Sequence, residues 1–208
     1  MIRRIGIALL LSCACLMAGA ADLKPGQDYR DIDPPLAPDR NKVEVTEFFW
    51  YGCPHCFNLE SVIPRWAGKL PPSVNFRRVP VVFPDGKWTP GARLYYTLEA
   101  MNLLERLHAD VFFAIHVERK RLHDQKTLFE WVAGKGVDAK AFAEAWGSFG
   151  VHSRVQQARE LTTRAGLNGV PAMVVDGRYQ AITPEKYEDL LTLVDRLIDR
   201  ARAERGGK

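Results

Sequence analysis

The sequence predicts an α/β protein in which a block of helices interrupts a sheet of strands. Two apolar stretches in the first half of the chain and a hairpin near its end are typical of strands. Between them, from residue 83 to residue 158, apolar side chains recur about every 3.6 residues, which indicates helices. With 208 residues, 47% of them hydrophobic, the chain can bury one core and carry a large insertion.

The first predicted strand leads directly into a pair of cysteines. Residues 43–50 are β-branched and aromatic with little alternation, which is the pattern of a strand buried on both faces. Cys53-Pro54-His55-Cys56 follows, and residues 57–69 are predicted to form a helix that Pro64 kinks. Pro54 suits the first helical turn, because no backbone donor is needed there.

Residues 74–82 form a second predicted strand, and the helical block follows it. Breaks at residues 134–138 and 147–150 divide the block, and Asp138 is a good N-cap for the helix after it. A longer helix is then predicted to end near Gly166.

Strands return near the C-terminus. Asp176-Gly177, between residues 172–175 and 178–181, is a strong signal for a two-residue hairpin. Thr183-Pro184 is predicted to open a final helix with one apolar face. Residues 22–41 are rich in Pro, Asp and Gly, and we expect them to be an extended lead-in.

The N-terminus has the three-part layout of a secretory signal peptide. Residues 1–4 are basic, residues 5–17 are apolar, and Ala18-Gly19-Ala20 is a small-residue cleavage site. An apolar run of about 13 residues is short for a membrane span of ~20, which argues against an uncleaved anchor. A lipoprotein site ending at Cys13 is a weaker alternative, because the leucine before Ser12 fits it poorly. We therefore expect cleavage near Ala20 and an exported, soluble protein.

Charge argues against nucleic-acid binding. The whole chain has a formal net charge of +4, from 29 basic and 25 acidic side chains. Arg3 and Arg4 are the only charged side chains in the predicted signal peptide, so 27 basic side chains remain against 25 acidic ones. No long basic run with interleaved aromatic residues is present.

Signal-peptide removal leaves Cys53 and Cys56 as the only cysteines. In an oxidising compartment such a pair is normally a disulfide, but this one closes a very small loop and is a poor structural crosslink. A zinc site needs about four ligands, and the chain offers no second cysteine pair, so we expect no metal. Redox chemistry is the interpretation that we favour. The other histidines of the second half are expected to be surface or core residues: His108, His116, His123 and His152.

The position of Cys53 at a helix N-terminus favours its thiolate. Unpaired backbone N–H groups and the helix dipole stabilise an anion there, and His55 can add an imidazole nearby. Sites of this kind bring a cysteine pKa from about 8.5 into a range of roughly 3.5–7.5. Cys56, one turn further along, is expected to be buried and within reach of Cys53. Such a pair acts as an oxidant, because its reduced form is stabilised.

Four motifs resemble those of the DsbA family of periplasmic thiol:disulfide oxidoreductases. They are Glu47-Phe48-Phe49, Cys53-Pro54-His55-Cys56, Ala145-Trp146-x-Ser148-Phe149 and Gly169-Val170-Pro171-Ala172-Met173. The resemblance implies a thioredoxin fold with an inserted α-helical domain. It divides the chain into a signal peptide (1–20), a discontinuous thioredoxin-like domain (21–82 and 159–208) and an inserted helical domain (83–158).

The resemblance also implies roles for residues around the cysteines. Pro171 is implied to be a cis proline that packs against the active-site disulfide, with Val170 before it. Glu47 is implied to be a buried acid that helps to move the proton of Cys56, and Glu60 is its acidic neighbour. Arg78 falls where well-known members carry lysine, which alters the charge balance because arginine keeps its proton. Trp50-Tyr51 and Gly52 also depart from the commoner aromatic run, so the substrate-facing surface is expected to differ.

The function that the resemblance implies is a dithiol oxidase of the periplasm. It would donate the Cys53–Cys56 disulfide to reduced, unfolded exported proteins and be reoxidised by a DsbB-like membrane partner linked to quinone. We expect a monomer with no cofactor beyond that disulfide. Two alternatives stay open, a disulfide isomerase or reductase of the same fold and a non-catalytic peptide-binding chaperone module. Isomerases of this kind usually need a dimerisation domain, and residues 21–42 are too short for one.

Overall fold

The structure is a computed structural model that describes residues 23–37, 39, 41–84 and 86–206. The predicted signal peptide, its cleavage site and the alternative lipoprotein cysteine lie outside these residues. No helix in the described part of the chain is long and apolar enough to cross a membrane.

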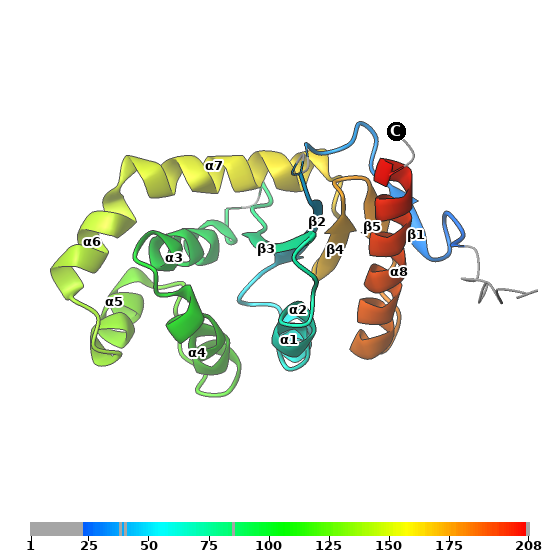
Figure 1. Ribbon diagram of the computed structural model, residues 1–208. Coiled ribbons are helices and arrows are strands. Elements are labelled where there is room, and N and C mark those ends of the chain that lie inside the picture. The colour runs from blue at the N-terminus through cyan, green and yellow to red at the C-terminus, as the bar shows by residue number, and fades with distance from the viewer. Residues whose placement is uncertain (1–22, 38, 40, 85, 207–208) are drawn as a thin grey trace, which may run out of the picture.

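Five strands of the described chain form one mixed sheet (Figure 1). They are β1 (Tyr29–Asp31), β2 (Val43–Phe49), β3 (Val74–Pro80), β4 (Ala172–Val175) and β5 (Tyr179–Ala181). Their order across the sheet is β1-β5-β4-β2-β3. The central strand β2 runs parallel to β3 and antiparallel to β4. The two remaining pairs, β4 with β5 and β5 with β1, are also antiparallel.

Eight helices are described. They are α1 (Pro54–Glu60), α2 (Ile63–Ala67), α3 (Thr89–Ala100), α4 (Leu104–His116), α5 (Gln125–Gly134), α6 (Ala139–Gly147), α7 (Phe149–Arg164) and α8 (Tyr187–Gly206). In Figure 1, α3 to α6 gather at one end of the molecule, and the long α7 runs back from them to the sheet. Helix α8 packs on β2, β4 and β5.

Several local predictions are confirmed. The Asp138 side chain accepts a hydrogen bond from the Ala141 backbone N–H at 2.7 Å and so caps α6. The hairpin between β4 and β5 turns at Asp176 and Gly177, whose φ angles are +55° and +65°. A Cβ on Gly177 would lie 2.5 Å from the Leu36 carbonyl oxygen, so only glycine fits this turn.

Other local predictions were wrong in detail. The lead-in contains a strand, β1, which pairs with β5 through Tyr29 and Ala181. The helix predicted over residues 57–69 is two helices, and Pro64 lies in the first turn of the second one, where a proline is tolerated. Helix α8 begins at Tyr187, after Thr183-Pro184 rather than at it. Helix α7 spans the boundary set at residue 158, and the division into domains stays a prediction.

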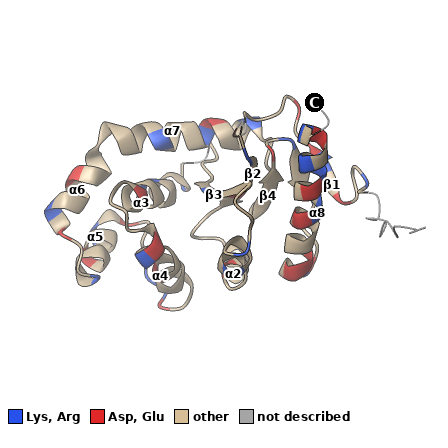
Figure 2. Cartoon of the chain, in the orientation of Figure 1, with Lys and Arg blue, Asp and Glu red and all other residues tan. Residues whose placement is uncertain are grey.

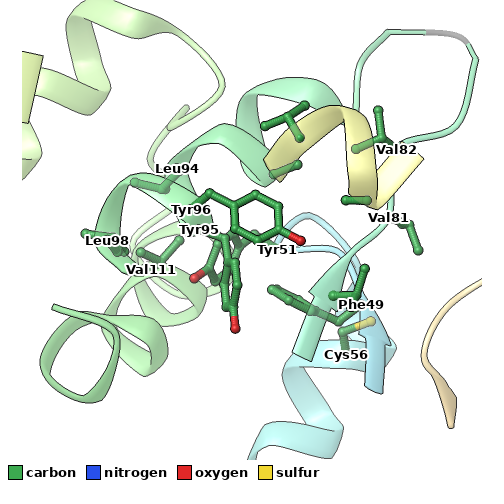
Figure 3. Packing of buried hydrophobic residues seen from close by; sticks show 14 of the residues in the cluster. Phe49, Tyr51, Cys56, Val81, Val82, Leu94, Tyr95, Tyr96, Leu98 and Val111 are labelled. Carbon is green, nitrogen blue, oxygen red and sulfur yellow. The ribbon is translucent and has the colours of Figure 1, made fainter. Parts of the chain in front are cut away.

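Two hydrophobic clusters cover the two faces of the sheet. One joins β2 and β3 to the helices between β3 and β4, and it contains both Cys53 and Cys56. Figure 3 shows Cys56 and Phe49 in this cluster with Tyr95 and Leu98 from α3. The other cluster packs α8 against the opposite face. The helices between β3 and β4 therefore share a core with the strand that leads into the cysteines.

Charged side chains of both signs are interspersed along the outer helices, as Figure 2 shows for α8. Within α8, Arg200 and Glu204 form an ion pair one turn apart at 3.0 Å. This mixed pattern is that of a solvated helix face rather than of a basic strip.

Candidate active site

The two cysteines lie at the start of α1, directly after β2. Cys53 is the N-cap residue, and Pro54 occupies the first turn. The Cys53 side chain is 7% exposed, whereas Cys56 is fully buried. Both are thiols in this structure. One sulfur therefore reaches the surface, and its partner lies behind it in the core.

The surroundings lower the pKa of the Cys53 thiol to about 6. The largest cause is the hydrogen bond from the Cys56 thiol, which outweighs the burial that opposes ionisation. The backbone N–H groups of Cys56 and His55 act in the same direction, as expected at a helix N-terminus. Cys53 is thus largely a thiolate at neutral pH.

Cys56 has the opposite character. Burial raises the pKa of its thiol far above the ordinary value, and the neighbouring Cys53 sulfur raises it further. The charge of Glu47 acts in the same direction. Cys56 consequently holds its proton when the pair is reduced. Its burial agrees with the position expected from the sequence.

His55 lies beside the pair but does not direct its ring at Cys53. Its Nδ1 is 3.2 Å from the hydroxyl oxygen of Tyr187, the first residue of α8. The imidazole charge is the smallest of the named influences that lower the pKa of Cys53. His55 acts on Cys53 more through its backbone N–H than through its ring.

The Val170-Pro171 peptide bond is cis, and it faces Cys53. The Cys53 thiol donates a hydrogen bond to the Val170 carbonyl oxygen at 3.3 Å. A groove of about 480 Å³ opens beside this bond. It is lined by residues 168–171 and 183–185 together with Arg30, His55, Gln180 and Tyr187.

Glu47, Arg78 and Glu60 form a charged cluster beneath α1. Glu47 on β2 and Arg78 on β3 are direct partners in the parallel register. Arg78 Nε donates to Glu47 Oε2 at 2.9 Å, and Arg78 Nη2 donates to Glu60 Oε2 at 3.1 Å. One arginine thus bridges two carboxylates. Burial nevertheless raises the pKa of Glu47 to about 7, against the attraction of Arg78.

Helix α4 holds the residues before Cys53 through two histidines that we call the α4 clamp, His108 and His116. His108 Nδ1 lies 2.8 Å from the hydroxyl oxygen of Tyr51, and His116 Nε2 lies 2.8 Å from the Tyr51 carbonyl oxygen. His116 also stacks on Phe57, the residue after Cys56, with ring centroids 4.9 Å apart. The clamp therefore contacts both flanks of Cys53-Pro54-His55-Cys56.

His108 also approaches the charged cluster. Its Nε2 is 3.6 Å from Glu60 Oε2, which is longer than a hydrogen bond. Burial lowers the pKa of His108, so its imidazole is neutral at pH 7. From the sequence, His108 was expected to be a surface or core histidine, and these contacts were not predicted. The signal that could have revealed them is the spacing of His108, Phe112 and His116, which places all three on one face of a helix.

The family model described as the DSBA-like thioredoxin domain matches residues 77–194. The thiol:disulfide interchange protein DsbA of Azotobacter vinelandii is 42% identical over 187 residues, covering 88% of this chain and 86% of that protein. The chain belongs to the DsbA family. It is a thiol:disulfide oxidoreductase with the thioredoxin-like fold of that family.

Other DsbA proteins match over a similar extent. The thiol:disulfide interchange protein DsbA of Pseudomonas aeruginosa is 36% identical, covering 97% of this chain and 98% of that protein. A crystal structure of Pseudomonas aeruginosa DsbA superposes with a TM-score of 0.84 at 37% identity, covering 89% of this chain and 97% of that one. Oxidoreductase DsbA from Xylella fastidiosa has a TM-score of 0.81 at 34% identity, covering 87% and 98%.

The structure brings together the residues that the sequence analysis singled out. Cys53 caps α1, Pro54, His55 and Cys56 begin its first turn, and Val170 and Pro171 face Cys53. Glu47 and Glu60 meet at Arg78. Within the described residues, no group of three or more His, Cys, Asp or Glu side chains is placed to hold a metal ion.

Proposed function

We propose that the chain is a periplasmic dithiol oxidase that transfers the Cys53–Cys56 disulfide to reduced, unfolded exported proteins. The observation that carries the proposal is the asymmetry of the pair. Cys53 keeps 7% of its surface exposed and has a pKa of about 6, whereas Cys56 is fully buried and has a raised pKa. A pair whose exposed thiolate is stabilised favours its reduced form and therefore oxidises other dithiols.

The reaction begins with attack of a client thiolate on the Cys53 sulfur of the disulfide. The Cys53–Cys56 bond breaks, Cys56 leaves and takes up a proton, and a mixed disulfide joins the client to Cys53. A second client thiolate then attacks the client sulfur of this mixed disulfide. Cys53 leaves as a thiolate, which its low pKa makes a good leaving group. The client gains one disulfide and loses two protons, and the protein ends with a Cys53 thiolate and a Cys56 thiol.

Glu47 supplies the proton that Cys56 takes up as it leaves. A carboxyl group with a pKa of about 7 is partly protonated at neutral pH and can both give and recover a proton. Glu47 influences the charge state of Cys56 directly, which supports their proximity. Arg78 holds Glu47 and Glu60 in place, and as an arginine it keeps its own proton.

The cis Val170-Pro171 segment receives the client. Its Val170 carbonyl oxygen lies 3.3 Å from the Cys53 sulfur, so a client joined to Cys53 lies against it. Extended client polypeptide can pair with such a backbone and place neighbouring side chains in the groove beside it. We further propose that the protein works as a monomer, with no cofactor beyond its own disulfide. A DsbB-like membrane oxidase linked to quinone would reoxidise it.

Equilibration of the mature protein with glutathione tests the direction of electron flow. We expect a reduction potential well above the value of about −270 mV that is typical of thioredoxin, towards the value of about −120 mV of a strong oxidant. A potential near that of thioredoxin would contradict the oxidase and favour a reductase.

Mixed disulfides test the chemistry itself. The Cys56→Ala variant keeps Cys53 but lacks the thiol that closes the disulfide. When this variant is first prepared as a mixed disulfide between Cys53 and glutathione, reduced client proteins should displace the glutathione and form covalent adducts at Cys53. Cys53→Ala should form none. If Cys56→Ala gives no adduct at Cys53, the protein is a non-covalent binder instead.

A further inference from the structure

A second pocket lies against the residues that precede Cys53. Trp50, Tyr51 and Gly52 form one wall, and the opposite wall comes from α3 and α4. We call it the loop pocket. Its volume of about 150 Å³ matches that of an engineered apolar protein cavity that admits a benzene ring.

The interior of the loop pocket is apolar. Leu94 of α3, Ile115 of α4 and Leu122 line it together with the Trp50 indole. Leu94 and Leu122 are buried, so they form a fixed floor rather than mobile surface side chains. A single ring or branched side chain that entered would exchange water for carbon contacts on several sides.

Gly91 keeps the loop pocket open. It occupies the third position of α3, and glycine favours a helix less than alanine does. A Cβ at this position would meet the Trp50 ring at 3.6 Å, which is ordinary van der Waals contact. Neither the backbone nor close packing demands a glycine here. What Gly91 provides is space beside the Trp50 ring.

Basic side chains surround the apolar interior. Among the described residues that line the loop pocket, Lys87, Lys120 and His123 are basic and none is acidic, and the Lys87 ammonium also lies over the Trp88 ring at 5.1 Å. Lys120 pairs with Glu118 at 3.6 Å, but both side chains are well exposed, and pairs of this kind contribute little in water. A carboxylate that arrived beside the ring would therefore find complementary charge.

The loop pocket and the groove at Val170 share no lining residue, and each has a lining residue next to Cys53. Gly52 of the loop pocket is the residue before Cys53, and Val170 of the groove accepts the Cys53 hydrogen bond. A client held at Cys53 thus has a recess on each side. One flank of the client lies in the groove, and the other is directed at the loop pocket.

We propose that the loop pocket binds an aromatic side chain of the client polypeptide that has a carboxylate beside it. The proposal deepens the proposed function and rests on it for the identity of the occupant. The ring fills the space beside Trp50 and Gly91, and the carboxylate faces Lys87 and Lys120. Clients with an aromatic and acidic flank would then be oxidised in preference to those with a basic flank.

A titration with 3-phenylpropanoate, followed by the backbone amide resonances of the reduced protein, tests the site without any redox step. We expect saturable shifts at Trp50, Gly52 and Gly91, and binding weaker by roughly threefold for the uncharged 3-phenylpropanamide. Gly91→Leu fills the recess and should abolish these shifts. Gly147→Leu is the matched control, because Gly147 is also helical, is exposed, has open space around an added side chain and does not line the loop pocket.

Charge variants keep the test decisive should Gly91→Leu fail to fold. Lys120→Gln should weaken 3-phenylpropanoate binding about two- to fivefold, whereas Lys140→Gln on the exposed surface of α6 should not. Absence of shifts at residues 50–52, or shifts confined to residues 168–171, would overturn the loop pocket. Equal binding to the wild type and to both Gly91→Leu and Lys120→Gln would also overturn it.

A client assay separates this proposal from the proposed function. Two reduced dithiol peptides that differ only in a Phe-Asp or a Phe-Lys flank are oxidised by the wild-type protein. We expect the Phe-Asp peptide to react several-fold faster. Equal oxidation of both peptides would contradict the loop pocket alone. Oxidation of neither, with a thioredoxin-like potential, would contradict the oxidase function.

Discussion

At the scale of single residues, the thiol of Cys56 is the largest influence on the pKa of Cys53, ahead of His55. We therefore expect Cys56→Ala to raise the pKa of Cys53 more than His55→Ala does. The alkylation rate of the reduced protein, measured against pH, reports this pKa because only the thiolate reacts. In the wild type the rate should rise through a midpoint near pH 6.

The two variants separate a hydrogen bond from a nearby charge. His55→Ala removes an imidazole whose Nδ1 lies beside Tyr187, so the midpoint should move upward by about one pH unit or less. Tyr187→Phe is a control that removes the hydroxyl partner of His55 and keeps the imidazole. A larger upward movement in His55→Ala than in Cys56→Ala would show that the imidazole, and not the buried thiol, stabilises the thiolate.

Glu47 makes the protein less stable as the pH rises. Its pKa is about 7 in the folded chain and 4.5 in the absence of burial. A carboxyl group with a raised folded pKa is neutral at pH 5, and its ionisation costs folding free energy as the pH rises from 4.5 through 7. Relative to the wild type, Glu47→Gln should gain about 2–3 kcal/mol in free energy of unfolding between pH 5 and pH 8.

Urea unfolding at the two pH values measures this difference, since each stability comes from the same linear extrapolation. Glu99→Gln is a suitable control, because Glu99 is an exposed partner of Arg154 and should change little with pH. A constant difference between Glu47→Gln and the wild type from pH 5 to pH 8 would mean that Glu47 is ionised throughout.

At the scale of elements, the α4 clamp ties the helical block to the residues before Cys53. His116→Ala removes the bond to the Tyr51 carbonyl and the stacking on Phe57. We expect a loss of about 1–2 kcal/mol in free energy of unfolding and faster amide exchange at Cys53. His152→Ala, at an exposed position of α7, should change stability by no more than about 0.5 kcal/mol.

His116→Gln provides the positive control for the clamp. Glutamine keeps an N–H donor for the carbonyl but loses the aromatic ring, so it should recover part of the protection at Cys53. Equal amide exchange at Cys53 in His116→Ala and in the wild type would show that the clamp does not position the loop.

The elements that the sequence predicted well are those with a strong local pattern. β2 is rich in β-branched and aromatic residues and is buried at nearly every position because both of its faces are covered, and the Asp176-Gly177 turn has two positive φ angles. β1 was missed because three residues carry no recognisable pattern, and its strand conformation depends on pairing with β5. The start of α8 was placed too early because Thr183-Pro184 satisfies local rules that tertiary packing overrides.

The sequence predicted those parts of the site whose residues are adjacent in the chain or belong to a family motif. Cys53 and Cys56 are adjacent on one helix turn, so their chemistry follows from spacing. The bridge from Arg78 to both Glu47 and Glu60 depends on strand register, which one sequence does not specify. The contacts of His108 and His116 with Tyr51 depend on how α4 packs on α1, and the loop pocket arises from the same packing.

At the scale of the whole molecule, one hydrophobic cluster spans the sheet and the helices between β3 and β4. Phe49 of β2 packs edge-on against Tyr95 of α3 and lies 5.9 Å from Phe112 of α4. Cys56 is a buried member of the same cluster (Figure 3). A change in the charge state at α1 therefore changes the free energy of unfolding of the whole fold rather than that of a separable part.

This coupling makes the difference in stability between reduced and oxidised protein depend on pH. Only the reduced form has the Cys53 thiol, whose pKa falls from 9.0 to about 6 on folding. A thiol whose pKa is lower in the folded than in the unfolded chain stabilises the fold. This stabilisation is fully present above pH 9.0, the unfolded pKa, and is lost as the pH falls through 6, the folded pKa. The advantage of the reduced form should therefore grow by about 2 kcal/mol between pH 6 and pH 8. Cys56 adds nothing in this range, because its thiol keeps its proton in both folded and unfolded chains.

Urea unfolding of the two redox forms at pH 6, 7 and 8 measures this advantage. Subtracting the free energy of unfolding of the oxidised form removes the contributions of the other titrating groups. Through the thermodynamic cycle, a growth of about 2 kcal/mol corresponds to roughly 40 mV in the reduction potential of the folded pair relative to the unfolded chain. In Cys53→Ser the two redox forms no longer exist, and the pH dependence should match that of the oxidised wild type. An advantage that stays constant from pH 6 to pH 8 would mean that Cys53 is not a stabilised thiolate, and the driving force for oxidising clients would then have to come from strain in the disulfide.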